Sequence, residues 1–456
     1  MGKRFHAPLT LAPAVPAAPG VALLSDTELD PTALYSVTYD GLVNNNSFQQ
    51  DAILTAHGHQ YAAWYTASRE AVVARRALGG PWRAAVLPHR LTADDSHNVI
   101  SLGVSRATGA LHVAMDCHNT RLHHTESVPG LTARPGNYEW SAGLFGPVRR
   151  TLGGLDLGPM TYPAFLTAPD GALQFSYRTG CSGDGVQELA ELRDGRWRAL
   201  GAWTSATGEY TAPNGVVSGS RNMYPHGLTY DLRGRLHVAF TWREGVIGVA
   251  GAPGGLANHD TGYAYSDDRG RTWRSTGGAV IGTTGGAPVG VGSPGALVDL
   301  VGPDRGLMNQ ESQAVDSSGA PHVVISYVPE RFAGCVEDYP RRRAQHGRVF
   351  HLALRGGAWV KREVPVVPGH TQRTKLVLDR ADNAYLLMPR GRIASASAAS
   401  GWSDWAQVHD GLPGAFGEVC ADVGRVRSEG VLSVLYQRVS ARSAPSPIRV
   451  ADFRLG

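Results

Sequence analysis

The chain has 456 residues, well above the usual domain length of about 100–150, with 43 basic against 39 acidic side chains. The basic residues, mostly arginine, are scattered along the sequence, whereas a nucleic-acid binder would concentrate them. No apolar run approaches the ~20 residues that cross a bilayer. We therefore expect neither nucleic acid nor a membrane as partner, and the sequence leaves the oligomeric state open.

The N-terminus and the cysteines bear on the compartment. The opening MGKRFHAPLTLAPAVPAAPG is interrupted by prolines where a signal peptide needs an unbroken apolar stretch. This predicts either a cytoplasmic protein or a secreted one whose leader has been removed. No CxxC pair is present, so neither a zinc knuckle nor a disulfide framework is indicated; the four cysteines are Cys117, Cys181, Cys335 and Cys420.

A repeated unit runs through the chain. A turn ending in glycine or asparagine, followed by an apolar strand, recurs seven times, roughly fifty or more residues apart. A bare four-stranded blade needs ~40–50 residues. The seven copies are Gly58-HQYAAWY, Gly109-ALHVAMD, Gly171-ALQFSYR, Gly234-RLHVAFT, Gly319-APHVVIS, Asn383-AYLLMP and Gly430-VLSVLYQ.

This repeat predicts an all-β fold, a seven-bladed β-propeller of four-stranded antiparallel blades. Six or eight blades remain alternatives, because some copies of the repeat match the others only weakly. We expect residues 1–30 to be a partly extended N-terminal extension and residues 31–456 to be a single propeller domain. Two β-sandwich domains would also give many short strands, but the recurring unit favours the propeller.

A second mark, a turn followed by tryptophan, falls between the repeats and predicts outer-strand hairpins. It occurs at Trp82, Trp197, Trp273, Trp359 and Trp405. Residues 266–273, SDDRGRTW, form a full Asp-box, in which an aspartate caps the turn and the tryptophan packs between sheets. Asp268 and Trp273 are therefore expected to be structural.

Polar residues that could meet at the central opening concentrate between residues 94 and 178. Two His–Asn pairs lie in neighbouring repeats, and a tyrosine and an arginine follow in the next one. The candidates are His97, Asn98, His118, Asn119, Tyr162 and Arg178. Three other histidines, His112, His237 and His322, occupy one repeat position and predict a packing role, whereas His123 and His124 are expected in an exposed loop.

Several segments resemble one known family. These are NNNSFQQDAILTAHGHQYAAWYTASREAVVARR, DDSHNVISLGV, the Asp-box and NQESQAVDSSGAPHVV. Together they are similar to the BNR-repeat propeller family that includes ulvan lyases and related rhamnose-(1→4)-glucuronate lyases. In that family a histidine, a second histidine about twenty residues on, a tyrosine, and an arginine sixteen residues after it form the site. The resemblance implies that His97, His118, Tyr162 and Arg178 are catalytic.

The chemistry of β-elimination suits this set. The enzyme must neutralise a uronate carboxylate, remove the C5 proton and protonate the departing O4 oxygen. Arg178 suits the carboxylate, assisted by His118. His97 can take the proton because its ordinary pKa, near ~6.5, leaves a neutral fraction at neutral pH. Tyr162 would donate to O4, or exchange roles with His97. Asn98 and Asn119, with Arg178, are predicted to bind substrate.

The resemblance implies an acidic glycan that contains rhamnose and uronate as partner, either ulvan or rhamnose-capped arabinogalactan. An α-L-rhamnosidase of the same superfamily is an alternative, but Gln49-Gln50-Asp51 stand where its histidine is expected. A propeller that binds an acidic glycan without catalysis is another alternative. A sialidase would need an arginine triad that the sequence lacks.

No cofactor is required for this chemistry. Residues of the later repeats could nevertheless converge on a structural zinc or calcium ion, and the resemblance to the lyase family implies a zinc ion of this kind. Zinc prefers four nitrogen or sulfur ligands. The candidate ligands are His226, His259, Cys335 and His351.

Overall fold

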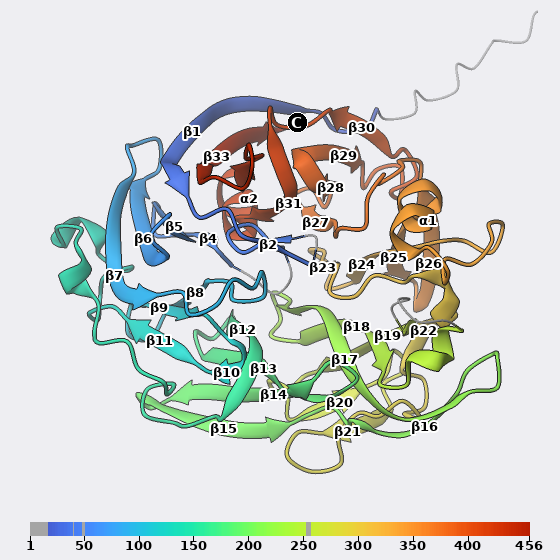
Figure 1. The fold of residues 1–456 in the computed structure, drawn as a ribbon. Helices are drawn as coiled ribbons and strands as arrows, with labels where there is room; N and C mark the ends of the chain where they lie inside the picture. The colour runs from blue at the N-terminus through green and yellow to red at the C-terminus, as the bar shows by residue number, and fades with distance from the viewer. Residues whose placement is uncertain (1–16, 40, 48–50, 252–256) are drawn as a thin grey trace, which may run out of the picture.

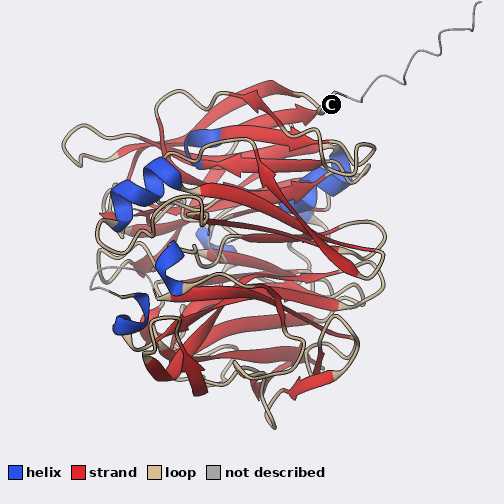
Figure 2. Ribbon diagram, turned by 90° about the vertical axis from the view of Figure 1, so that its right-hand side faces the viewer, coloured by secondary structure: helices blue, strands red, loops and turns tan. Residues whose placement is uncertain are grey.

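A computed structural model describes residues 17–39, 41–47, 51–251 and 257–456. Its sheets are arranged in a ring around a central axis, and the chain follows the ring in order from blue to red (Figure 1). Strands make up most of the regular structure, and the helices are short (Figure 2). The predicted all-β propeller is confirmed, and two separate sandwiches are excluded. Among the described residues, no helix has the length and apolarity needed to cross a membrane.

The first three sheets supply the strands nearest to the candidate residues. The first has the order β4 (Ile53–Ala56), β5 (His59–Tyr65), β6 (Glu70–Ala77) and β7 (Arg83–Arg90). The second has the order β8 (Ser101–Ser105), β9 (Ala110–Met115) and β11 (His123–Glu126). The third has the order β10 (His118–Arg121), β12 (Pro159–Thr167), β13 (Leu173–Cys181), β14 (Asp184–Arg193) and β15 (Arg196–Ala202).

The fourth to sixth sheets continue the ring. The fourth comprises β16 (Thr207–Thr211), β17 (Val217–Tyr230), β18 (Leu236–Glu244), β19 (Asn258–Ser266), β20 (Thr272–Arg274) and β21 (Val280–Thr283), with β22 (Leu297–Asp299) beside β19. The fifth comprises β23 (Ser312–Val315), β24 (Pro321–Tyr327), β25 (Arg348–Arg355) and β26 (Ala358–Val364). The sixth comprises β27 (Lys375–Leu378), β28 (Ala384–Met388), β29 (Arg392–Ala396) and β30 (Ala406–His409).

The seventh sheet closes the ring with strands from both parts of the chain. Its order is β31 (Ala415–Ala421), β32 (Val431–Arg438), β33 (Ser446–Leu455) and β1 (Val21–Ala33). Strand β1 runs antiparallel to β33, from Val21 opposite Leu455 to Ala33 opposite Ser446. The boundary expected at residue 30 therefore falls inside a propeller strand, and residues 1–16 of the expected extension lie outside the described residues.

The remaining elements are short. A two-stranded ribbon, β2 (Val37–Thr38) and β3 (Gly41–Leu42), precedes the first sheet. The two α-helices are α1 (Tyr339–His346) and α2 (Val423–Glu429). Single turns of 3₁₀-helix occur at Pro135–Asn137, Ala142–Leu144, Ile247–Ala250, Pro303–Arg305 and Pro389–Gly391.

Each of the seven sequence repeats forms an interior strand of its sheet, with a paired strand on either side. These strands are β5, β9, β13, β18, β24, β28 and β32. Because both faces of such a strand pack against neighbouring sheets, its residues are apolar without strict alternation. Strand β28, for example, is buried at all five positions. The repeat is therefore a signal of burial between sheets.

The prediction of seven four-stranded blades is wrong, because only six of the sheets in the ring are complete blades. Six sheets have four or more strands, whereas the second has three. The place of its outer strand is taken by the isolated bridges His124–Arg149 and Ser127–Phe145. The segment between them contains Pro129, Pro135 and Pro147, and proline has no N–H to donate to a ladder. The second blade is consequently incomplete at its rim.

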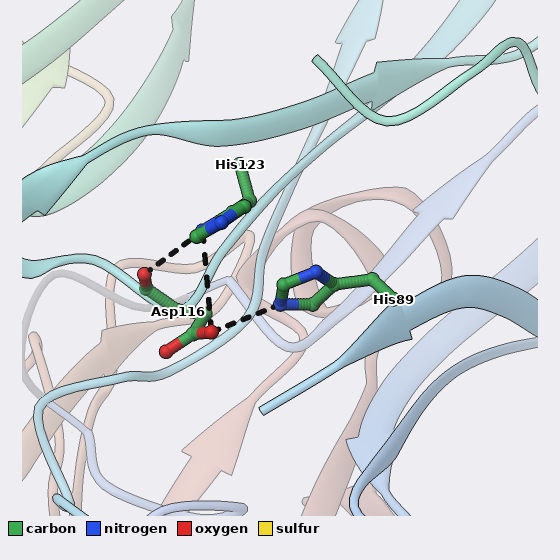
Figure 3. Close-up of side chains that lie close together, drawn as sticks. All are labelled: His89, Asp116 and His123. Carbon is green, nitrogen blue, oxygen red and sulfur yellow. Dashed lines mark hydrogen bonds and ion pairs between the residues drawn. The ribbon is translucent and has the colours of Figure 1, made fainter. Parts of the chain in front are cut away.

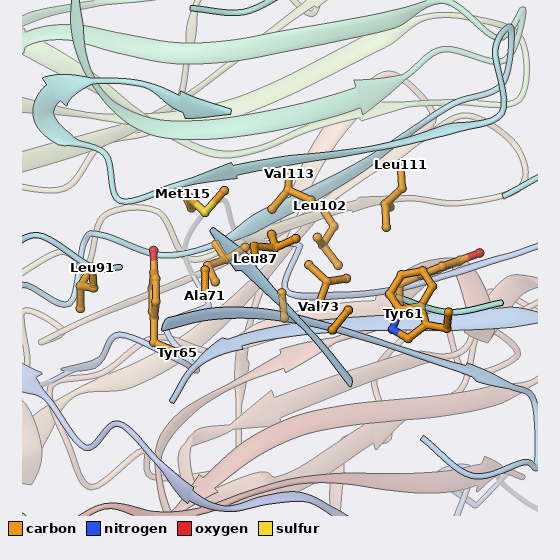
Figure 4. Close-up of a cluster of buried hydrophobic side chains, with 14 of the residues drawn as sticks. Tyr61, Tyr65, Ala71, Val73, Leu87, Leu91, Leu102, Leu111, Val113 and Met115 are labelled. Atoms are coloured by element: carbon orange, nitrogen blue, oxygen red, sulfur yellow. The ribbon is translucent and has the colours of Figure 1, made fainter. Parts of the chain in front are cut away.

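Apolar side chains fill the space between adjacent sheets. Figure 4 shows the cluster between the first and second sheets, where Tyr61 and Val73 lie near Leu102, Leu111 and Val113. All five side chains are almost completely excluded from solvent. Burial of this kind stabilises the fold by about 25 cal/mol per Å² of apolar surface. It also fixes the neighbouring blades relative to one another.

The Asp-box has the structural role expected of it. Asp268 Oδ1 accepts hydrogen bonds from the backbone N–H groups of Thr272 at 2.7 Å and Arg271 at 3.1 Å. Trp273 is fully buried, and its ring stacks on Trp203 with the centroids 4.4 Å apart. The turn thus delivers the tryptophan into the core of the fourth sheet.

We expect Trp273→Ala to lower the free energy of unfolding by about 3–5 kcal/mol, because a buried aromatic ring is lost and a cavity remains. Guanidinium denaturation followed by circular dichroism measures the change. Trp82→Ala, at a half-buried tryptophan, should cost clearly less. Equal losses in the two variants would contradict the assignment of Trp273 to the core.

Candidate active site

One cavity of ≈ 590 Å³ contains all four residues predicted to be catalytic. His97 reaches it from the loop between β7 and β8, His118 from β10, Tyr162 from β12 and Arg178 from β13. Asn119 also lines it. Residues predicted from three consecutive repeats thus meet at one place.

The third sheet fixes three of these residues by its register. Thr161 of β12 lies opposite His118 on one side and opposite Arg178 on the other. Register shifts follow in both pairings, between His118 and Thr120 and between Thr161 and Ala164. Such bulges re-aim side chains next to active sites. The short strand β10, which leaves the second sheet for the inner edge of the third, is what carries His118 to this position.

The backbone is strained at the two bulges. Asn119 has φ 53° and Tyr162 has φ 61°, the left-handed region that side chains other than glycine rarely adopt. Strain of this kind costs about 1–3 kcal/mol and gathers at functional sites. The sequence around Tyr162, including the neighbouring Pro163, did not predict this strain. The strain sets the direction in which the Tyr162 side chain leaves its strand.

A carboxylate holds the two histidines. Asp95 Oδ1 lies 2.7 Å from His97 Nδ1, and Asp95 Oδ2 lies 2.6 Å from His118 Nδ1. The two imidazole rings stack at 18° with their centroids 4.3 Å apart. Burial works to raise the pKa of Asp95, but the hydrogen bonds from His118 and His97 outweigh it, so the pKa lies well below 3.8. Asp95 is therefore an ionised acceptor that orients both rings.

The charge on Asp95 decides the tautomer of His97. An ionised carboxylate accepts a hydrogen bond, so Nδ1 carries the proton and Nε2 keeps its lone pair. Burial lowers the pKa of His97 below its usual 6.5, although the hydrogen bond to Asp95 works against this shift. His97 is consequently neutral at pH 7 and can accept a proton through Nε2.

Arg178 is a buried cation without a buried anion. Its side chain is only 1% exposed, and its Nη2 donates to Asn119 Oδ1 at 3.0 Å and Thr161 Oγ1 at 3.1 Å. Among the described residues, no carboxylate pairs with it, and its Nε has no hydrogen-bond partner. A buried, unpaired charge is costly unless a ligand compensates it. The arrangement therefore favours an anionic ligand in this cavity.

Two tyrosines lie beside Arg178. The guanidinium carbon of Arg178 lies 5.1 Å from the centroid of the Tyr162 ring, and the Tyr162 and Tyr224 centroids are 6.1 Å apart. Burial raises the pKa of Tyr162 far above 10, so its phenol stays protonated. Burial acts in the same sense on Tyr224, but the charges of Arg243 and Arg178 overcome it and lower the pKa of Tyr224 below 10. Tyr162 is thus the proton donor of the pair.

Sequence reasoning missed the residues that later sheets contribute to the cavity. Arg373 precedes β27, and its Nη1 donates to Glu418 Oε1 of β31 at 3.1 Å, while its Nη2 donates to Asn309 Oδ1 at 2.8 Å. Tyr224 and Arg243 come from the fourth sheet. No spacing links these residues to residues 94–178. Asp95, by contrast, could have been found, because it stands two positions before His97.

Some predicted residues lie elsewhere. Asn98 is buried, does not line the cavity, and donates through Nδ2 to the Ala93 carbonyl oxygen at 3.2 Å, so it stabilises the loop that carries His97. Gln49 and Gln50, at the position discussed for a rhamnosidase, lie outside the described residues.

The four predicted zinc ligands are not brought together. His226 Nδ1 accepts from the backbone N–H of Glu311, and His259 lies between Glu244 and Asp260. Cys335 donates to a backbone carbonyl, and His351 pairs with His322 at 3.0 Å. Within the described ranges, clusters of three or more metal-ligating groups occur only at His89–Asp116–His123 and Asp95–His97–His118. His226 and His259 belong to β17 and β19 of the fourth sheet with β18 between them, His351 belongs to β25 of the fifth sheet, and Cys335 lies in a loop outside the strands.

The remaining histidines divide into two groups. His112, His237 and His322 are buried, as predicted from their shared repeat position. The expectation of an exposed loop for His123 and His124 is wrong. Both are buried in β11, where His123 lies opposite Met115 of β9. The polar sequence RLHHTE did not predict a buried strand, because neighbouring strands and loops are what exclude it from solvent.

We expect Asp95→Asn to lower kcat at least ~10²-fold with little change in KM, because both imidazoles lose their orienting charge. Since Asp95 raises the pKa of His97, the acidic limb of the pH–rate profile should also move to lower pH. Asp94→Asn is the matched control, because the neighbouring Asp94 pairs with Arg69 outside the cavity. An unchanged limb in Asp95→Asn would contradict the positioning role.

Comparisons with known proteins agree with this architecture. The crystal structure of polysaccharide lyase Uly1 superposes with TM-score 0.70 at 16% identity, covering 95% of this chain and 99% of that one. A polysaccharide lyase PL25 ulvan lyase bound to -[GlcA(1-4)Rha3S]- superposes with TM-score 0.63 at 14% identity, covering 93% and 95%. No curated protein sequence matches. The profile of the BNR repeat-containing family matches residues 59–366, and the chain therefore belongs to that family.

Proposed function

We propose that the protein is a polysaccharide lyase that cleaves an acidic glycan by β-elimination at a rhamnosyl-(1→4)-uronate linkage. One observation carries the proposal, namely that the buried, unpaired Arg178 faces the same cavity as a neutral histidine and a protonated tyrosine. A uronate carboxylate would supply the anion that the described residues do not offer to Arg178.

In the proposed reaction, Arg178 neutralises the carboxylate at C5 and His118 assists it. The C5 proton becomes acidic and passes to Nε2 of His97. Its electron pair forms the C4–C5 double bond as the C4–O4 bond breaks. Tyr162 gives its phenolic proton to O4 of the leaving sugar. The products are an unsaturated uronate and a free hydroxyl group, so atoms and charge balance once His97 and Tyr162 have exchanged protons with water.

The similar solved structures support the substrate class. One is described as bound to a glucuronate-(1→4)-sulfated rhamnose unit, and both are described as polysaccharide lyases. Their sequence identity to this chain, 14–16%, carries the fold alone. The substrate assigned here therefore depends on the cavity, whose described lining includes Arg178, Arg243 and Arg373 against the single acidic residue Glu418. This charge balance suits an acidic glycan.

The test is the ultraviolet absorbance of a 4,5-unsaturated uronate during incubation with ulvan and, separately, with gum-arabic arabinogalactan. A rise with one polymer supports the proposal and identifies that polymer. Release of free rhamnose without a rise in absorbance would replace it with an α-L-rhamnosidase. Binding of either polymer without any product would replace it with a glycan-binding propeller.

A further inference from the structure

A second cluster of histidines and aspartate lies apart from the four predicted catalytic residues. His89 of β7 directs Nε2 to Oδ2 of Asp116 at 3.0 Å. His123 of β11 places Nδ1 at 4.0 Å from the same oxygen and 3.2 Å from the backbone oxygen of Asp116. Figure 3 shows the two rings next to each other, each joined to Asp116 by dashed lines. The ring centroids of His89 and His123 are 4.4 Å apart.

The cluster is enclosed. The Asp116 side chain is 0% exposed, and the His89 and His123 side chains are 9% and 10% exposed. The proposed reaction uses none of the three. Thr92 fixes the carboxylate of Asp116, because its backbone N–H donates to Oδ2 at 2.9 Å and its hydroxyl donates to Oδ1 at 3.0 Å. Hydrogen-bonded ligands of this kind orient a metal site.

We propose that His89, Asp116 and His123 bind a divalent transition-metal ion, Zn²⁺ being the best match. Zinc accepts a ligand set of two imidazoles and one carboxylate, with a fourth position left for water, at bond lengths of about 2.0–2.2 Å. Ligand atoms around one such ion lie about 3–3.5 Å apart. The three donor atoms here lie within 4.8 Å of one another. To bind the ion, His123 Nδ1 would exchange its contact with the backbone oxygen of Asp116 at 3.2 Å for the metal.

The site would join the first sheet to the second, three-stranded one. His89 belongs to the outer strand of the first sheet and His123 to β11 of the second, which lacks a fourth strand, and Asp116 directly follows β9 of the second sheet. Thr92 begins the loop that carries Asp95 and His97, and Asp116 stands two residues before His118. A bound ion would therefore fasten the incomplete blade to its neighbour and fix both ends of the segment that presents the histidine pair.

The other cluster of potential ligands, Asp95 with His97 and His118, is a weaker candidate. Both of its Nδ1 atoms already share Asp95, and its rings stack almost in parallel. Its side chains are also more exposed, at 16–21%. A metal bound through these Nδ1 atoms would replace the hydrogen bonds to Asp95 that orient both rings. The two clusters can be distinguished by separate substitutions.

The experiment titrates the chelator-treated full chain with Zn²⁺ by calorimetry and, separately, with Co²⁺ by visible absorption. One equivalent should bind to the wild type, raise the Tm and give the d–d bands of a four-coordinate cobalt site. His123→Ala and His89→Ala should each lose the bands and the Tm rise. His118→Ala, which removes a ligand of the other cluster only, should keep both.

The outcomes separate this inference from the proposed function. No binding to the wild type overturns it, and so does binding that disappears in His118→Ala but persists in His123→Ala. If His123→Ala fails to fold, the cobalt spectrum of the wild type, measured with and without the His118→Ala substitution, still decides. Neither readout depends on catalysis, so the metal site can fail while the lyase proposal stands, and the reverse.

Discussion

Arg178→Ala is expected to lower kcat/KM for the uronate polymer by about 10³-fold or more, because the substituted enzyme cannot neutralise the carboxylate in the transition state. The change should appear in kcat as well as KM, since charge accumulates at the carboxylate as the C5 proton leaves. Initial rates of absorbance increase at several polymer concentrations measure both constants.

Two further variants sharpen this expectation. Arg178→Lys keeps the charge but lacks the planar pair of donors, so it should recover only part of the activity. Arg198→Ala removes an exposed arginine from β15 of the same sheet and should leave the rate unchanged. The assignment fails if Arg178→Ala retains activity within tenfold of the wild type while its far-ultraviolet circular dichroism is native.

His97→Ala is expected to lower kcat by about 10²–10⁴-fold, the usual contribution of a positioned general base. The reaction needs the neutral imidazole, so activity is lost as pH falls through the pKa of His97. Because burial lowers this pKa below 6.5, the acidic limb of the wild-type profile should lie below pH 6.5 and should be absent from the residual activity of the variant.

His57→Asn is the matched control, since His57 is exposed in the β4–β5 turn and its left-handed φ of 45° suits asparagine. It should keep both the rate and the acidic limb. If the limb persists in His97→Ala, another group is the base. Tyr224, whose pKa is lowered below 10 by Arg243 and Arg178 against the effect of burial, would then be the next candidate.

The propeller could be predicted because its signal is repeated. Each copy of the strand marks the same buried position, and the Asp-box turn is specified by local hydrogen bonds of Asp268. The rim of the second blade could not be predicted, since the repeat marks only an interior strand of each sheet and says nothing about the outer one. The same limit explains β11, whose histidines look solvent-exposed in sequence and are covered by neighbouring sheets.

Sequence reasoning could predict only those residues of the candidate site whose chemistry suits catalysis and which also follow one another closely in the chain. His97, His118, Tyr162 and Arg178 follow one another through three repeats, and the structure places them on one cavity. Arg373 and Glu418 reach the cavity from the opposite side of the ring. Their proximity to the other residues therefore depends on closure of the ring of sheets and leaves no local pattern in the sequence. The bulges at Asn119 and Tyr162 likewise depend on pairing across strands.

The pairing of β1 with β33 has a consequence for the order of folding. Its contacts join residues far apart in the chain, as in the hydrogen bond from Arg449 to Asp26, which spans 423 positions. Contacts of such separation carry a large loop-closure cost and form late. The sheet they complete also supplies Glu418, which accepts hydrogen bonds from Arg373 and Ser47. The cavity is therefore complete only once β33 has paired with β1, and binding competence should emerge in a single late step of folding.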